Sequence, residues 1–114
     1  MDPRIKNGKG ILNTRVKNRE WFRPFAPSCI DVDEYYHLPP SWYMSYSCEA
    51  PKGWKENVPS VVHVDGSCRP HVVSYRSNPA LYWILALWNE ATGMPFLLNT
   101  SLNINTPILC DRQI

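Results

Sequence analysis

The fold is decided by residues 78–93, which read Asn-Pro-Ala-Leu-Tyr-Trp-Ile-Leu-Ala-Leu-Trp-Asn-Glu-Ala-Thr-Gly. Asn78 is typical of a helix N-cap, Pro79 of the first helical position, and Gly93 of the left-handed residue that ends a helix. Apolar side chains nearly encircle the axis between Leu81 and Trp88. The sequence therefore predicts a helix that is buried on more than one side.

Strands are predicted on both sides of this helix. Met94–Leu98 is a short apolar run that follows it. Upstream, Val61–Val64 and Val72–Tyr75 are rich in β-branched residues and flank the turn signal Asp65-Gly66, which predicts a hairpin whose turn carries Arg69. Strand, helix and strand in this order predict a mixed α/β fold.

The N-terminal half is less regular. Asn13–Glu20 contains good helix formers without Gly or Pro and predicts a basic helix. Two prolines within Trp21–Pro27 predict a rigid, extended arm after it. Asp31–Pro59 shows no clean period, so an ordered but irregular segment is expected there, with one candidate strand at Ser41–Ser47.

Composition bounds the class of protein. The 114 residues are 44% hydrophobic and 19% charged with a formal net charge of +2, which fits one small domain or part of one. No apolar run of about 18 residues and no secretory signal are present, so a membrane span is excluded and a cytoplasmic protein is expected. The cysteines lie far apart without metal-ligand spacing, which predicts free thiols and no metal site: Cys29, Cys48, Cys68 and Cys110.

Positive charge is concentrated at the N-terminus. Residues 1–28 contain seven basic and two acidic side chains, a balance of +5 that leaves −3 for the remainder. Such a front end indicates contact with nucleic acid, contact with a phosphorylated small molecule, or only a solvated helix face. Composition does not distinguish these three.

Three clusters contain residues suited to chemistry. In the first, Lys17 and Arg23 are six residues apart across the predicted helix-to-arm junction, where an ammonium and a guanidinium would face one phosphate-binding pocket. The alternative is a solvated basic helix end. The second, His63–Arg69, lacks the nucleophile elbow of serine hydrolases, and ordinary turn chemistry explains it equally well.

The third cluster, Asn99-Thr100-Ser101-Leu102-Asn103, follows an apolar strand. Ligands in α/β sheets favour the carboxyl ends of strands, and neutral amides and hydroxyls suit a base edge, a ribose or an oxyanion. A capped turn is the alternative. Because no glycine-rich phosphate loop is present, side chains would have to do most of any phosphate binding.

Four blocks become recognisable together. In this order and spacing, residues 19–28, 62–69, 92–95 and 98–103 resemble the C-terminal domain of the O-carbamoyltransferase family, which includes nodulation and antibiotic-biosynthesis carbamoyltransferases. The blocks read Arg-Glu-Trp-Phe-Arg-Pro-Phe-Ala-Pro-Ser, Val-His-Val-Asp-Gly-Ser-Cys-Arg, Thr-Gly-Met-Pro and Leu-Asn-Thr-Ser-Leu-Asn. The resemblance runs from about Asp2 to Cys110.

The resemblance implies a YrdC-like twisted sheet with packed helices, incomplete here, and a transferase that forms carbamoyl adenylate from carbamoyl phosphate and ATP. It also implies a partner, an N-terminal, sugar-kinase-like domain that holds any metal and passes the carbamoyl group to an acceptor hydroxyl. Residues 1–114 are then expected to be one partial domain, truncated at both ends, and inactive alone.

The resemblance further implies roles for individual residues. Lys17 and Arg23 would hold phosphate or carbamoyl oxygens, and Arg69 would add charge stabilisation, so these three form the expected catalytic set. The rest of the expected nucleotide- and substrate-binding set comprises Arg19, Asn99, Thr100, Ser101 and Asn103. Fixed cations and hydrogen-bond donors would stabilise the negative charge that builds up during attack at phosphorus.

The sequence departs from the family at two places. Residues 103–108 lack a glycine of the family motif and are one residue shorter, and Pro70-His71 replaces an apolar residue and a glutamine. Two alternatives to the transferase are a module that binds RNA or single-stranded DNA, with nucleic acid the less favoured partner, and an inactive truncated remnant.

Overall fold

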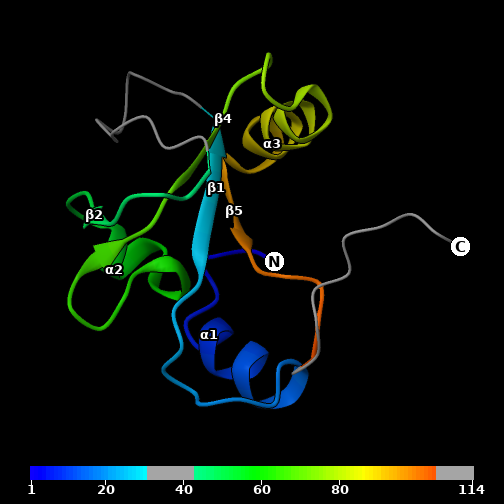
Figure 1. The fold of residues 1–114 in the computed structure, drawn as a ribbon. Coiled ribbons are helices and arrows are strands. Elements are labelled where there is room, and N and C mark those ends of the chain that lie inside the picture. The colour runs from blue at the N-terminus through cyan, green and yellow to red at the C-terminus, as the bar shows by residue number, and fades with distance from the viewer. Residues whose placement is uncertain (31–42, 105–114) are drawn as a thin grey trace, which may run out of the picture.

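The computed structural model describes residues 1–30 and 43–104, which form a mixed α/β fold as the sequence predicts (Figure 1). The helical elements, in chain order, are α1 (Gly8–Ile11), the π-helical η1 (Leu12–Val16), α2 (Trp54–Asn57), the 3-10 turn η2 (Pro59–Val61) and α3 (Pro79–Thr92). The strands are β1 (Ala26–Ile30), β2 (Cys48–Glu49), β3 (Ser67–Cys68), β4 (His71–Val73) and β5 (Phe96–Asn99).

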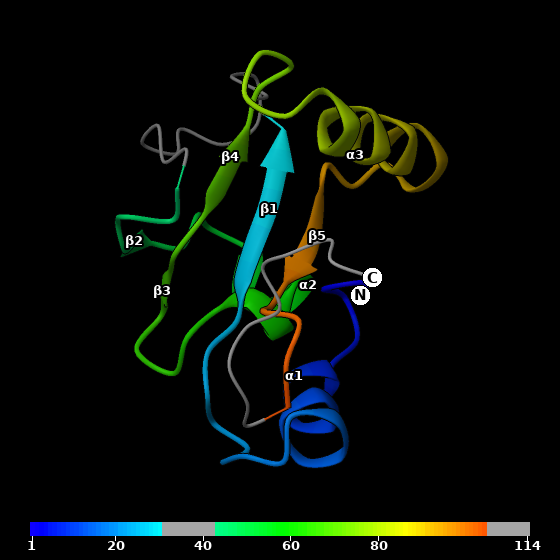
Figure 2. The ribbon, with the colours of Figure 1, turned by 45° about the vertical axis from the view of Figure 1, so that its right-hand side comes forward.

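A three-stranded sheet in the order β4-β1-β5 forms the centre of the molecule. β1 runs parallel to β4 and antiparallel to β5, with Ser28 opposite both His71 and Leu97. A second, two-stranded sheet pairs β2 with β3. Helix α3 lies near one end of the central sheet and α1 beyond the other (Figures 1 and 2).

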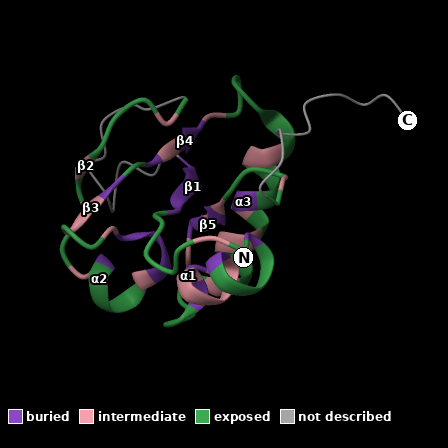
Figure 3. Ribbon diagram, turned by 60° about the horizontal axis from the view of Figure 1, so that its bottom comes forward, coloured by how far each residue is buried: buried purple, intermediate pink, exposed green. Residues whose placement is uncertain are grey.

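The central sheet is covered on both faces, because side chains alternate along each strand. On one face, Ile30 and Val73 pack with Leu85 of α3. On the other, Cys29, Val72 and Phe96 join the larger core around Trp54 of α2, whose ring centroid lies 4.9 Å from that of Phe96. β1, the central strand, is accordingly buried along its whole length (Figure 3).

Helix α3 begins and ends where the sequence predicts. Asn78 Oδ1 accepts a hydrogen bond from the backbone N–H of Leu81 at 3.0 Å, and Gly93 adopts a left-handed φ of +72°. The predicted burial is wrong, since of its residues only Leu85 is fully buried. The outward face carries Trp83, Ile84 and Leu87, which remain 56%, 55% and 62% exposed.

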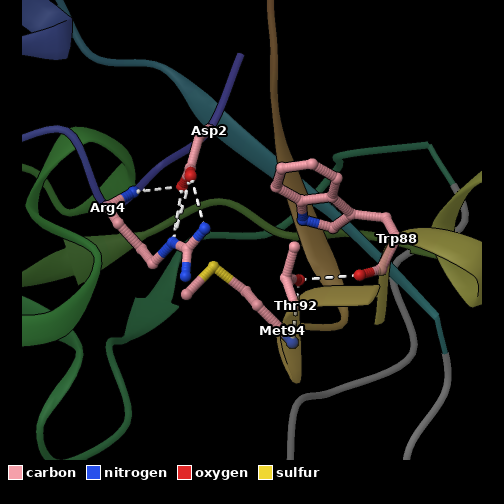
Figure 4. A network of polar contacts seen from close by, with 5 residues as sticks. All are labelled: Asp2, Arg4, Trp88, Thr92 and Met94. Atoms are coloured by element: carbon pink, nitrogen blue, oxygen red, sulfur yellow. Dashed lines mark hydrogen bonds and ion pairs between the residues drawn. The ribbon is translucent and has the colours of Figure 1, made fainter. Parts of the chain in front are cut away.

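The first residues of the chain anchor beside the end of α3. Thr92 Oγ1 donates to the Trp88 carbonyl at 2.7 Å and accepts from the Met94 N–H at 3.2 Å. Arg4, paired with Asp2 at 2.7 Å, lies next to Met94 (Figure 4). The N–H of Leu98 in β5 donates to the Met1 carbonyl at 2.9 Å, so the N-terminus lies against β5 at the edge of the sheet.

The predicted hairpin of residues 61–64 and 72–75 is wrong. The turn is present, because Gly66 has a φ of +83° and the His63 N–H donates to the Ser67 carbonyl at 2.8 Å. Val61 and Val62 are buried, but in a 3-10 turn and its exit rather than in a strand. The residues after the turn pair elsewhere: β3 with β2, and β4 in parallel with β1.

Three other expectations need adjustment. The basic helix predicted at residues 13–20 begins earlier, at Gly8, and ends at Val16. The arm predicted over residues 21–27 already enters β1 at Ala26. Residues 43–47 form no strand, and Ser41 and Trp42 lie outside the described residues.

The described cysteines, Cys29, Cys48 and Cys68, are thiols that form no disulfide, as predicted; Cys110 lies outside the described part. No helix in that part is both long and apolar enough to cross a membrane.

Candidate functional site

A pocket of about 210 Å³ opens where three strands of the central sheet meet loops. It lies at the start of β1, just before β4, and at the end of β5. Asn99, Thr100 and Ser101, which the sequence predicts to bind a ligand, line this pocket together with residues near the starts of β1 and β4, and their binding role stays a prediction. Its lining residues are Arg19, Pro24, Phe25, Ala26, Met44, Arg69, Asn99, Thr100 and Ser101.

Arg19 is held in this pocket by a fully buried asparagine. Asn13 Oδ1 accepts from Arg19 Nε at 2.8 Å, while Asn13 Nδ2 donates to the Trp21 and Arg23 carbonyls at 2.9 Å each. The Arg19 guanidinium also lies 5.0 Å from the ring centroid of Phe25. Burial, and next the charge of Arg23, lower the pKa of Arg19. The side chain is therefore fixed before any ligand arrives.

Arg69 supplies the second guanidinium of the pocket. It makes no hydrogen bond or ion pair with another residue of the described part, and no carboxylate from that part lines the pocket. Two guanidinium groups without a balancing carboxylate attract an anion, and the planar fork of arginine matches phosphate or carboxylate oxygens.

Lys17 is placed differently from the expectation that it shares a pocket with Arg23. Its buried ammonium donates to the Ser101 carbonyl and, at 2.9 Å, to the Asn103 carbonyl. Burial lowers the pKa of Lys17, and the nearby charge of Arg19 adds to this effect. In this structure Lys17 holds the loop that follows β5, and its role toward a ligand stays a prediction.

Arg23 lies outside the pocket lining. Its Nε pairs with Glu20 at 2.8 Å, and both side chains are about half exposed, at 52% and 53%. The expected convergence of Lys17 and Arg23 on one pocket is therefore absent here. Arg23 remains near enough to Arg19 to lower the pKa of that residue, so it contributes to the positive potential at the rim.

The loop after β5 divides between two cavities. Asn99, Thr100 and Ser101 line the pocket with the arginines. Asn103 accepts a hydrogen bond from Ser101 Oγ at 2.6 Å and so stiffens the loop. A larger, mainly apolar groove of about 610 Å³ adjoins through Thr100 and Ser101, and its other lining residues are Val16, Lys17, Leu102, Asn103 and Ile104.

The cluster at residues 63–69 is a closed turn, apart from Arg69. Asp65 Oδ1 accepts from the Ser67 N–H at 2.9 Å and from its hydroxyl at 2.6 Å, and His63 Nδ1 lies 2.9 Å from Ser67 Oγ. Burial lowers the pKa of His63, and the hydrogen bonds from Ser67 lower that of Asp65. The interpretation as turn chemistry is confirmed for these three residues.

Comparison with known proteins places this chain in a family. The model of the family described as carbamoyltransferase C-terminus matches residues 1–113. The chain belongs to the carbamoyltransferase C-terminus family. This agrees with the resemblance of the four sequence blocks.

Relatives of this carbamoyltransferase C-terminal chain include several nodulation proteins. The chain is 36% identical to nodulation protein NolNO of Sinorhizobium fredii over 96% of its own length, and 36% identical to nodulation protein NolO of Bradyrhizobium diazoefficiens over 91%. It is 34% identical to nodulation protein U of Rhizobium tropici over 92%. It spans only 17%, 20% and 21% of these three proteins.

Sequence reasoning missed three residues of this carbamoyltransferase C-terminal chain that organise the pocket. Asn13 positions Arg19, and Ser28 and His71 contact Asn99 from the neighbouring strands. A polar residue inside a predicted basic helix and a serine after two prolines are weak signals, because only the tertiary arrangement gives them partners. Within the described residues no three His, Cys, Asp or Glu side chains gather as metal ligands.

Proposed function

We propose that this chain is the part of a carbamoyltransferase that binds the activated, phosphate-bearing carbamoyl donor. The pocket takes carbamoyl phosphate and, with ATP as co-substrate, holds carbamoyl adenylate. A separate N-terminal domain of the same enzyme transfers the carbamoyl group to an acceptor hydroxyl and holds any metal. The observation that carries this proposal is the pair Arg19 and Arg69 beside Asn99, Thr100 and Ser101, without a carboxylate among the described lining residues.

The positive side of the pocket suits the phosphate of the donor. Arg19 keeps its terminal nitrogens for a ligand, because Asn13 engages only Nε. The Thr100 hydroxyl adds a neutral hydrogen-bonding group at the same wall, whereas the Ser101 hydroxyl already donates to Asn103. Guanidinium groups and hydroxyls that are already in place stabilise developing negative charge without reorganisation.

The adjoining apolar groove suits the nucleoside part of ATP. Val16, Leu102 and Ile104 offer apolar surface, with exposed fractions of 45%, 71% and 56%. Since Thr100 and Ser101 line both cavities, a ligand with its phosphate at the arginines would reach the groove with its base.

The proposed reaction has two steps. Water releases phosphate from carbamoyl phosphate, and the resulting carbamate oxygen attacks the α-phosphorus of ATP. The bond from that phosphorus to pyrophosphate breaks as the bond to the carbamate oxygen forms. Charge accumulates on the phosphoryl oxygens during this attack, so fixed cations and positioning are the main catalytic devices.

Nucleic acid fits the basic front end less well. An open strand-binding groove needs cations that are free to contact successive phosphates. Four of the seven basic side chains of residues 1–28 are instead engaged: Arg4 with Asp2, Arg23 with Glu20, Lys9 with the Val62 carbonyl and Lys17 with the loop after β5. A fifth, Arg19, lines the pocket.

Calorimetric titration of the purified chain with carbamoyl phosphate and with ATP tests the proposal. We expect binding of both, and a loss of about 1.5–3 kcal/mol in carbamoyl phosphate binding for Arg69→Ala, since a hydrogen bond to a charged group is removed. Arg76→Ala is the matched control, because it removes the same charge from the exposed turn before α3. A cooperatively folded chain that binds neither compound would refute the proposal.

A further inference from the structure

Three polar side chains from three adjacent strands meet on one face of the central sheet. Ser28 of β1, His71 of β4 and Asn99 of β5 each lie two residues along their strand from Ile30, Val73 and Leu97, on the same face and beyond the area covered by α3. Ser28 Oγ lies 3.1 Å from His71 Nδ1 and 2.9 Å from Asn99 Nδ2. Asn99 also lines the pocket, so this cluster connects the sheet to the site.

The hydrogen bonds of this cluster fix the orientation of the Asn99 amide. Asn99 Nδ2 faces three atoms that can accept: Ser28 Oγ, His71 Nδ1 at 3.4 Å and Met44 Sδ at 3.8 Å. An amide nitrogen can only donate, so Ser28 Oγ accepts from Asn99 Nδ2. In the His71 tautomer that carries its proton on Nε2, the Ser28 hydroxyl in turn donates to His71 Nδ1.

This orientation leaves a particular group for a ligand. Asn99 Oδ1 has no hydrogen-bond partner among the described residues, whereas Nδ2 is occupied. A carbonyl oxygen can only accept hydrogen bonds. The pocket therefore presents one acceptor, at Asn99, in addition to the donors of Arg19 and Arg69. Carbamoyl phosphate has the matching pattern, since its phosphate and carbonyl oxygens accept hydrogen bonds and its amide nitrogen donates them.

We propose that Ser28 and His71 are positioning residues that aim Asn99 Oδ1 at the amide N–H of the ligand, so that the pocket selects carbamoyl over acyl groups that lack an N–H. This inference rests on the proposed function and specifies which end of the donor each wall recognises. A site that aims a fixed acceptor at a ligand N–H rejects the analogue without it, because the acceptor then stays unpaired.

Acetyl phosphate is the probe for this selectivity, since it replaces the amide by a methyl group of similar size. Calorimetric titration of the wild-type chain should give at least tenfold tighter binding of carbamoyl phosphate than of acetyl phosphate. Ser28→Ala should reduce this preference at least fivefold, mainly by weakening carbamoyl phosphate, and should leave acetyl phosphate affinity within about twofold.

His71 provides a second pair of variants that distinguishes positioning from a packing role. His71→Gln retains an acceptor for the Ser28 proton and should keep the preference, whereas His71→Leu removes the acceptor and should lose it. Ser77→Ala is the remote serine control, in the exposed turn before α3. Circular dichroism and the unfolding midpoint establish that each variant is folded, and the His71 pair decides the question if Ser28→Ala does not fold.

The outcomes of these titrations distinguish failure of the positioning role from failure of the proposed function. A wild-type chain that binds both phosphates equally, or folded variants of Ser28 and His71 that keep the full preference, would overturn the positioning role and leave the proposed function intact. A folded wild-type chain that binds neither phosphate would overturn both.

Discussion

At the scale of single residues, the pocket depends on arginines whose surroundings the sequence conceals. The spacing of Lys17 and Arg23 predicts a shared phosphate pocket. In the structure, however, Lys17 donates to the loop after β5 and Arg23 forms an ion pair with Glu20. Arg19 and Arg69 line the pocket instead. Sequence spacing therefore indicates that basic residues lie near the pocket. Which of them line it depends on tertiary contacts, which spacing does not encode.

Substitution of Asn13 should lower both the stability of the fold and the affinity for carbamoyl phosphate. Asn13→Ala removes the acceptor for Arg19 and leaves the Trp21 and Arg23 carbonyls without their donor. We expect a loss of about 1–3 kcal/mol in the free energy of unfolding, together with weaker binding of carbamoyl phosphate. Urea unfolding and calorimetry measure the two effects, with exposed Thr14→Ala as the control. A variant with unchanged binding would show that Arg19 needs no support.

Arg23 should influence a bound phosphate only from a distance. Its exposed ion pair with Glu20 stabilises the fold little, and its charge is open to screening by salt. In calorimetric titrations with carbamoyl phosphate, Arg23→Ala should cost less than Arg69→Ala, and its effect should shrink as salt rises from about 0.05 M to 0.3 M. An effect of Arg23→Ala that matches Arg69→Ala at both salt concentrations would place Arg23 in direct contact with the phosphate.

At the scale of secondary-structure elements, α3 and β5 are the parts that the sequence predicts well. Asn78, Pro79 and Gly93 act locally, through a cap, a fixed φ and a left-handed turn, so they specify the bounds of α3 without tertiary help. The burial of α3 is not local, and there the prediction fails. The outward face of α3 is apolar but exposed. Apolar residues on all sides of a predicted helix therefore do not establish that this chain buries the helix on all sides.

β1 is the element that sequence reasoning misses, for an identifiable reason. Pro27 lies in the middle of the central strand of the sheet, where a residue without an N–H is unusual. The prolines of residues 24–27 therefore indicate a loop, although five successive buried residues form a strand there. The valines of residues 61–64 mislead in the opposite direction, because β propensity reflects burial as much as backbone conformation.

The contact between α1 and η2 gives a prediction about packing. A Cβ added at Gly8 would lie 2.6 Å from Ser60 Oγ, and this hydroxyl is held by the Ile5 carbonyl at 2.5 Å. Gly8→Ala should therefore destabilise the chain: overpacking costs about 1–3 kcal/mol, and the better helix propensity of alanine returns at most about 1 kcal/mol.

Urea unfolding of a double-mutant cycle tests the Gly8 contact. In a Ser60→Ala background the obstructing oxygen is gone, so Gly8→Ala should cost less than it does in the wild type. Equal costs in the two backgrounds would mean that Ser60 is not the obstacle.

At the scale of the whole molecule, stability should fall at alkaline pH through Cys68. Burial, with the neighbouring Cys48 next, raises the pKa of Cys68 to about 12. A cysteine in the unfolded chain loses its proton near pH 8.5, so between about pH 9 and 12 the unfolded state binds fewer protons and unfolding becomes easier. Below about pH 8.5 Cys68 keeps its proton in both the folded and the unfolded state, so its contribution to stability is fully present.

The variant Cys68→Ala isolates this effect from other titrating groups. Lys9 and Lys17, whose pKa values burial lowers, act in the opposite direction because their folded forms lose protons first. We expect the stability advantage of the wild type over Cys68→Ala to narrow above pH 9, by at most about 1.4 kcal/mol per pH unit. Urea unfolding at about pH 7.0, 9.5 and 10.5 measures the difference in the free energy of unfolding between the two proteins. A difference that stays constant with pH would contradict the role of Cys68.

The central sheet also dictates when a binding-competent molecule exists. β1 must wait for partners that lie far along the chain, since Ser28 contacts His71 across 43 residues and Asn99 across 71. Closing such long loops is slow, and local structure gains little from it in advance. As the chain leaves the ribosome, α1 and β1 emerge before β4 and β5, and the pocket can assemble only once the residues after α3 have been synthesised. Ligand binding is therefore a property of the finished fold, and no early folding intermediate should possess it.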